Sequence, residues 1–215
     1  MTLANSPSSI RVETGHGDIR TIQTGRTWAQ FKHLQQGFEN TRGLRLFYYN
    51  GTIEILMPGE AHELFKSVIG FLIETFLFSR SIEFKPTGSM TQEKEGIAAA
   101  EADESYEIDG YRLSVEVNFT SGDAAKLERY QALGVDEVWM WEDGCLVVYH
   151  RQSGPSAEDQ YEVIARSGIP ALAEIDLSLL STCILLGETS RIQAAQRLLA
   201  AHPAKPEDNS VNKNI

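Results

Sequence analysis

A regular alternation of apolar and polar residues marks the segment from Tyr111 to Phe119. Leu113 and Val115 alternate with Ser114 and Glu116, and successive side chains of a strand point to opposite faces of a sheet. The pattern therefore predicts a strand with one apolar and one polar face. Because a lone buried carboxylate is costly unless it is paired or binds a cation, Glu116 requires a partner.

Hydrophobic periodicity and turn residues divide the rest of the chain into helices and strands. Asn-Gly at 50–51 and Asp-Gly at 143–144 are hairpin signals, because both turn positions need a positive φ. Asp-Gly at 109–110 turns the chain into the Glu116 strand. Helices are predicted at 27–37, 60–79, 120–133 and 189–201, and strands at 45–49, 52–57, 82–85, 103–108, 111–119, 137–141, 145–150 and 161–166.

This order of elements predicts an α/β fold, with a mixed β-sheet flanked by helices and an N-terminal β-hairpin at 45–57. A length of 215 residues suits one domain that needs no disulfide framework. We expect residues 1–26 to be loosely ordered, residues 27–180 to form the domain, and residues 181–215 to add a C-terminal helix and a polar tail.

Composition limits the compartment and the partners that we expect for the protein. The two cysteines form no framework, which favours a reducing, cytoplasmic compartment. No apolar run reaches the roughly 18 residues of a membrane span, so we expect no membrane partner. The net charge of −11 argues against a protein that coats nucleic acid by charge alone.

Several charged residues are candidates for chemistry. An acid cluster that includes Asp103 precedes the Glu116 strand by a short connection, so two acids can meet at one point. Lys126 lies in the first turn of the following helix. His62 and Glu63 open the long helix but lack the second His of a zinc-protease motif, so we interpret them as a capping or surface pair, with a place at the edge of the active cleft as the alternative.

Other candidates are weaker. The five histidines share no spacing and neither cysteine lies in a paired motif, which argues against structural zinc. Ser114 lacks the Gly-x-Ser-x-Gly elbow of a nucleophile. Trp139 and Trp141 share one strand face, where core packing is favoured over base stacking.

The order of four motifs resembles a known family. These motifs are E-A-D-E-S-Y at 101–106, S-V-E-V-N at 114–118, T-S-G-D-A-A-K-L-E-R-Y at 120–130 and G-V-D-E-V-W at 134–139. Together they resemble a bacterial restriction endonuclease family, formerly a domain of unknown function, in the PD-(D/E)XK nuclease superfamily. The resemblance covers roughly residues 27–180 and implies a restriction-endonuclease-like core.

The resemblance also implies roles for three residues. Asp103 and Glu116 match the two metal-binding acids, and Lys126 matches the catalytic lysine, displaced from the strand onto the following helix. The sequence departs from the superfamily pattern at Ala102, where Pro usually precedes the first acid, and at Asn118, where lysine is usual.

This motif set implies a Mg²⁺-dependent endonuclease, with Mn²⁺ as a substitute and DNA as the expected nucleic acid partner. Mg²⁺ prefers oxygen ligands such as one or two carboxylates, and a lysine can stabilise charge that develops at the phosphate. The resemblance makes a homodimer an open expectation. The alternative is a catalytically silent protein of the same fold that binds nucleic acid or a protein partner.

Overall fold

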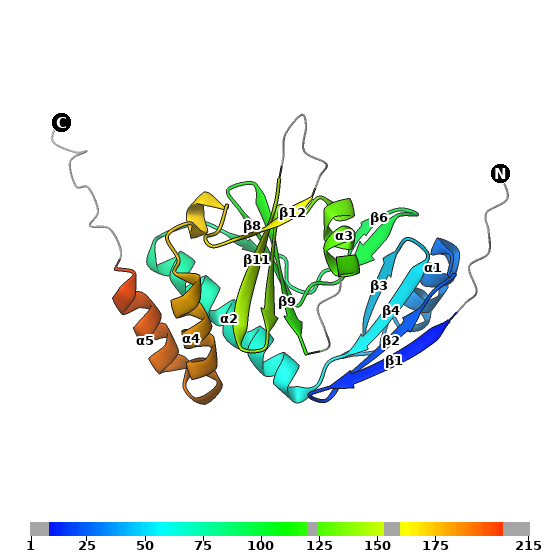
Figure 1. Cartoon of the computed structure of the whole chain (residues 1–215), viewed down its shortest axis with the longest axis horizontal. Helices are drawn as coiled ribbons and strands as arrows, with labels where there is room; N and C mark the ends of the chain where they lie inside the picture. Colours follow the sequence, from blue (N-terminus) through cyan, green and yellow to red (C-terminus); the bar gives the residue numbers. More distant parts are fainter. Residues whose placement is uncertain (1–8, 120–123, 153–159, 204–215) are drawn as a thin grey trace.

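The computed structural model describes residues 9–119, 124–152 and 160–203, which form two six-stranded sheets and five α-helices (Figure 1). Sheet A has the order β1 (Ile10–Gly15), β2 (Asp18–Gln23), β4 (Thr52–Met57), β3 (Arg45–Tyr49), β7 (Ala98–Ala100) and β6 (Gln92–Lys94). Sheet B has the order β12 (Tyr161–Ile164), β11 (Cys145–Arg151), β10 (Glu137–Glu142), β9 (Tyr111–Asn118), β8 (Glu104–Ile108) and β5 (Lys85–Pro86).

Sheet A is antiparallel throughout. Sheet B is mixed, because β9 and β10 run parallel while its other neighbours are antiparallel. Its parallel pair is joined through a helix, as parallel neighbours require. The helices are α1 (Trp28–Gly37), α2 (Glu60–Ser79), α3 (Ala124–Leu133), α4 (Leu177–Thr189) and α5 (Arg191–Ala201), with a short 3₁₀ turn at Pro170–Leu172. The α/β class and the mixed sheet are thus as predicted.

The two faces of β9 meet different surroundings. Val115 and Val117 are buried in a large apolar cluster together with residues of α2, α4 and α5. The opposite face carries Glu116 and meets α3, where a second cluster joins residues of α3, β10 and sheet A. In Figure 1, α3 lies between the two sheets. The polar face of β9 is therefore buried as well.

Local sequence signals match the backbone closely. Asn50 and Gly51 have φ values of 45° and 76°, and Asp143 and Gly144 have values of 47° and 79°. Both pairs adopt the left-handed conformation that a tight two-residue hairpin requires. The side chain of Thr27 accepts from the amide of Gln30 and forms a capping box, which starts α1 where predicted. The expected helix start at 120–123 lies outside the described residues.

Three expectations are wrong in detail. Residues 10–23 were expected to be loosely ordered, but they form β1 and β2, which extend sheet A because β2 pairs along β4. Of the predicted strand 82–85, only Lys85 pairs with β8, and the pairing continues at Pro86. The boundary placed at residue 180 falls inside α4, and α4 and α5 bury side chains in the same core as the sheet.

Hydrophobicity and helix length also bear on the predicted absence of a membrane span. None of the helices within residues 9–119, 124–152 and 160–203 is both long and apolar enough to cross a membrane. The longest of them, α2, buries Val68, Ile69, Leu72, Ile73, Phe76 and Leu77 in the cluster shared with sheet B and the C-terminal helices, while Phe78 is exposed.

Candidate nuclease site

Asp103 lies immediately before β8, where that strand begins to pair with β9. Its amide donates to the carbonyl of Val115 at 3.1 Å, and its Oδ2 accepts from the amide of Val117 at 2.6 Å. The carboxylate is therefore fixed on the backbone of the residue that follows Glu116. Both acids are almost completely inaccessible, with exposures of 0% for Asp103 and 1% for Glu116.

A histidine links Asp103 to the β1–β2 hairpin. Nε2 of His62 lies 2.7 Å from Oδ1 of Asp103, and Nδ1 lies 2.8 Å from Oδ2 of Asp18. The guanidinium of Arg45 forms an ion pair with Asp103 and donates to Glu63 at 2.8 Å. The interpretation of His62 as a capping or surface residue is wrong, because the ring is fully buried between two acids.

Both ring nitrogens of His62 face carboxylate oxygens, Nδ1 that of Asp18 and Nε2 that of Asp103. Nε2 also lies 3.4 Å from Nη1 of Arg45. A neutral ring has one N–H group, so the tautomer of the ring decides which carboxylate receives its hydrogen bond. His62 and Arg45 thus both surround Oδ1 of Asp103.

Glu116 is held by α3, the helix that follows its strand. The hydroxyl of Tyr130 donates to Oε1 of Glu116, and the ammonium of Lys126 lies 3.9 Å from Oε2. Lys126 also donates to the side-chain oxygen of Asn118, whose amide donates to Glu142 at 2.8 Å. Helix α3 thus brings Lys126 to both Glu116 and Asn118, which follows Glu116 by two residues on β9.

Tyr130 keeps its proton in this environment. Burial raises the pKa of Tyr130 well above its ordinary value, and the neighbouring charge of Glu116 raises it further. The hydroxyl therefore remains a donor and fixes one oxygen of Glu116. Tyr130 follows Lys126 by four residues, so the two side chains share a face of the helix.

A second buried charge cluster adjoins this one on sheet A. Glu54 accepts from Nε of Arg20 at 2.7 Å and from Arg129 at 3.3 Å. Burial alone would raise the pKa of Glu54, but the charges of Arg129, Arg20 and Lys126 together lower it to about 2. Lys126 therefore contributes to the electrostatics of both clusters.

The donor set allows a test of whether a divalent cation fits. Within the described residues, no group of three or more His, Cys, Asp and Glu side chains is arranged to hold a metal ion. Mg²⁺ needs only one or two carboxylates, with water and substrate completing its shell. Asp103 and Glu116 supply anionic oxygens, and Oε2 of Glu116 meets only Lys126 among the described residues. Both acids carry the oxygen ligands that Mg²⁺ prefers, while both oxygens of Asp103 already have partners in His62, Arg45 and the amide of Val117.

The weaker candidates from the sequence are the two tryptophans of β10, Ser114 and the two cysteines. Trp139 and Trp141 are buried in the main apolar cluster, as predicted. The hydroxyl of Ser114 is buried without a hydrogen-bond partner among the described residues. Of the two cysteines, Cys145 is exposed and Cys183 is buried.

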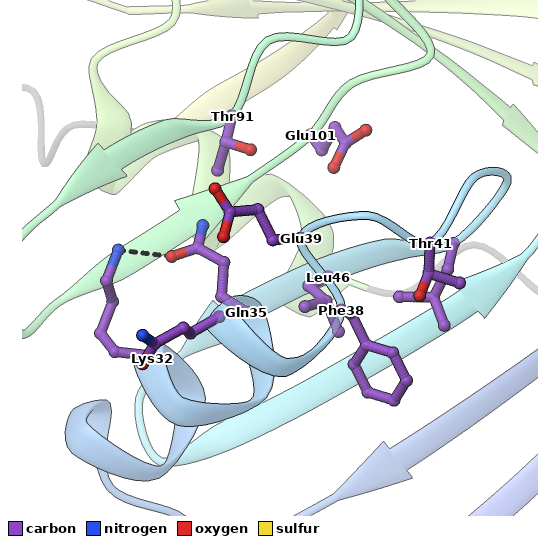
Figure 2. A pocket seen from close by; sticks show the side chains of 10 residues that line it. Lys32, Gln35, Phe38, Glu39, Thr41, Leu46, Thr91 and Glu101 are labelled. Carbon is purple, nitrogen blue, oxygen red and sulfur yellow. Dashed lines mark hydrogen bonds between the residues drawn. The ribbon is translucent and has the colours of Figure 1, made fainter.

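A cleft of about 630 Å³ lies beside the acid cluster (Figure 2). Glu101, two residues before Asp103, lines it, and burial raises the pKa of Glu101 against the opposing charges of Arg45 and Lys66. Lys32 and Gln35, which are hydrogen-bonded, stand on the α1 side. The lining comprises Lys32, Gln35, Gln36, Phe38, Glu39, Thr41, Leu44, Leu46, Thr91 and Glu101. Its acids outnumber its single cation, so it suits neutral hydrogen-bonding groups better than phosphate.

Comparison with known proteins adds no relationship. No protein-family model matches this chain, and no curated protein matches it.

Proposed function

We propose that this protein is a metal-dependent endonuclease that hydrolyses phosphodiester bonds, with DNA as the expected substrate and a restriction-endonuclease-like core. One observation carries the proposal. The ammonium of Lys126, contributed by a helix, lies 3.9 Å from Glu116 and is hydrogen-bonded to Asn118. These contacts support the assignment of Lys126 as a lysine that acts from the helix beside Glu116.

Asp103 and Glu116 hold Mg²⁺, or Mn²⁺ in its place, through their carboxylate oxygens. The bound cation supplies polarisation of the phosphoryl oxygen and a lower pKa for water. Lys126 places a positive charge where negative charge develops at phosphorus. Tyr130 and His62 do not contact the phosphate in this assignment; they fix the orientation of the two acids.

Burial sets a requirement on access. Because Asp103 and Glu116 are nearly inaccessible, a phosphodiester reaches them only when covering side chains move aside. Before that step, Arg45 forms an ion pair with Asp103, and Lys126 lies 3.9 Å from Glu116.

The same burial favours a second candidate function. A carboxylate that is already paired with cations can serve stability alone, since structural ion-pair networks also contain perturbed groups. The chain would then be a catalytically silent nuclease-fold protein that binds nucleic acid or a protein partner. In that case the charge network would hold sheets A and B together around α3.

Direct assays separate the two functions. Labelled single- and double-stranded DNA and RNA are incubated with the wild-type protein in Mg²⁺, Mn²⁺ or EDTA, and binding is measured in parallel by fluorescence anisotropy. The nuclease proposal expects metal-dependent cleavage, with DNA cut fastest. Binding without cleavage under every metal condition supports the silent protein. If the protein neither binds nor cleaves any of these nucleic acids, both nucleic acid functions are ruled out.

A further inference from the structure

Strand β1 is one of the two edge strands of sheet A within the described part of the chain, and β6 is the other. The carbonyl of Ser9 accepts from the amide of Thr24 at 3.1 Å, so these two residues form a hydrogen-bonded pair. Such pairs alternate along an antiparallel ladder. The register with β2 therefore turns the amides and carbonyls of Ile10, Val12 and Thr14 toward the open edge.

The same strand carries an exposed apolar stripe. Ile10 and Val12 are 64% and 60% exposed, and Ile19 and Met57 beside them are each 42% exposed. The register pairs Thr14 with Ile19 and Ile19 with Met57, so all of these side chains lie on one face of sheet A.

Helix α1 covers only part of that face. Phe31 of α1 packs with Leu46, Tyr48 and Ile53 on the central strands of sheet A. The outer strands lie beyond this cluster, toward the end of the sheet where β1 runs in Figure 1. A long edge strand with an exposed apolar face is a template for pairing with another chain.

The charges of β1 identify the partner. Arg11 and Glu13 flank Val12 on the opposite face, where they form an ion pair at 2.9 Å and Arg11 is exposed; Glu13 also contacts Arg20 at 3.1 Å. A two-fold axis that passes between the Val12 residues of two copies places Arg11 opposite Glu13 of the second copy. It likewise places Glu13 opposite the second copy's Arg11. Both are non-hydrogen-bonded pairs, in which antiparallel Cα atoms are about 4.5 Å apart and opposite charges attract. The edge is therefore self-complementary in charge as well as in backbone polarity.

We propose that β1 pairs antiparallel with β1 of a second copy about a two-fold axis between the two Val12 residues. This pairing joins two A sheets into one continuous sheet. Ile10, Val12 and Thr14 exchange their free main-chain hydrogen bonds with Thr14, Val12 and Ile10 of the second copy. The apolar stripes then meet on one face. Such isologous pairing is the usual symmetry of homodimers. This dimer does not depend on nuclease activity.

The association is tested by sedimentation equilibrium of the full chain over a micromolar to millimolar range. Arg11→Glu places two like-charged pairs at the interface and is expected to weaken dimerisation about tenfold or more. Arg42→Glu makes the same charge change in an exposed turn and should dimerise like wild type. Val12→Pro removes an amide that faces away from β2, so it should also yield a folded monomer.

Cross-linking locates the axis. In a Cys145→Ser background, Val12→Cys should form a symmetric disulfide under mild oxidation, because hydrogen-bonded antiparallel pairs lie about 5.5 Å apart at Cα. Val163→Cys, at a residue 66% exposed on β12, is the matched control and should stay uncross-linked. A wild-type protein that remains monomeric overturns the proposal. Equal dimerisation of Arg11→Glu and Arg42→Glu also overturns it. Equal cross-linking of Val12→Cys and Val163→Cys does the same, because the two copies would then meet at a surface other than β1.

Discussion

Nε2 of His62 lies 2.7 Å from Oδ1 of Asp103, with both side chains fully buried. The other ring nitrogen contacts Asp18, whose Oδ1 accepts from the amide of Gly59 at 2.7 Å just before α2 begins. One imidazole therefore connects the β1–β2 hairpin, the start of α2 and the loop before β8. These are the elements that position the first acid of the candidate site.

Replacing His62 should lower the stability of the folded protein, because the buried acids Asp18 and Asp103 lose a hydrogen-bond partner. His62→Ala is expected to lower the free energy of unfolding by about 3 kcal/mol or more, because an uncompensated buried charge remains. His33→Ala, at an exposed position of α1, should change it by less than about 0.5 kcal/mol. Urea unfolding at neutral pH measures both variants. Equal stability of the two would show that the His62 contacts contribute nothing.

Glu54 predicts a pH dependence of stability. Its pKa is about 2 in the folded protein against an ordinary value of 4.5, so the folded state favours the ionised form. This stabilisation is complete above pH 4.5 and is lost as the pH falls toward 2. It amounts to about 3 kcal/mol for a shift of this size.

Glu54→Gln isolates that contribution. The wild-type advantage in unfolding free energy should be largest above pH 4.5 and should shrink as acid protonates the unfolded chain first. Chemical denaturation of both proteins across this range gives the difference directly. A difference that stayed constant down to pH 2 would contradict the assigned electrostatics.

Metal binding should stabilise the folded protein through Glu116. Mg²⁺ or Mn²⁺ is expected to raise the melting temperature of the wild type, because a ligand that binds only the folded state stabilises it by mass action. Glu116→Gln should abolish that increase, whereas Glu107→Gln, at a half-exposed position of β8, should retain it. The same increase in all three proteins would remove Glu116 from any metal site.

Features that depend on neighbouring residues could be predicted from the sequence. The predicted bounds of the helix at 60–79 match α2, because its apolar stripe and flanking turn residues are local signals. The same holds for the Asn50-Gly51 turn, where the positive φ requirement is met by the residues themselves. Strand β9 was predictable from its alternation to within one residue.

The residues that surround the two acids were harder to predict from the sequence. His62 lies 44 residues from Asp18 and 41 from Asp103, so no local pattern indicates that the three meet. Pairing of the β1–β2 hairpin along β4 is equally a tertiary effect. Tyr130 could have been found, because its spacing of four residues from Lys126 places it on the same helical face. That face also carries Arg129.

Plasmid nicking by Lys126 variants tests the central claim most directly. Initial rates on supercoiled DNA in Mg²⁺ and in Mn²⁺ are compared for wild type, Lys126→Ala and Lys85→Ala, a control whose side chain is 72% exposed on β5. A Lys126→Ala, Asn118→Lys double variant returns the cation to the strand position and should recover part of the activity. We predict metal-dependent nicking by wild type and Lys85→Ala, and a rate at least about 100-fold lower for Lys126→Ala, as expected when one charge stabiliser is lost. Nicking by Lys126→Ala as fast as by wild type, or no metal-dependent nicking by wild type at all, would contradict the proposed site.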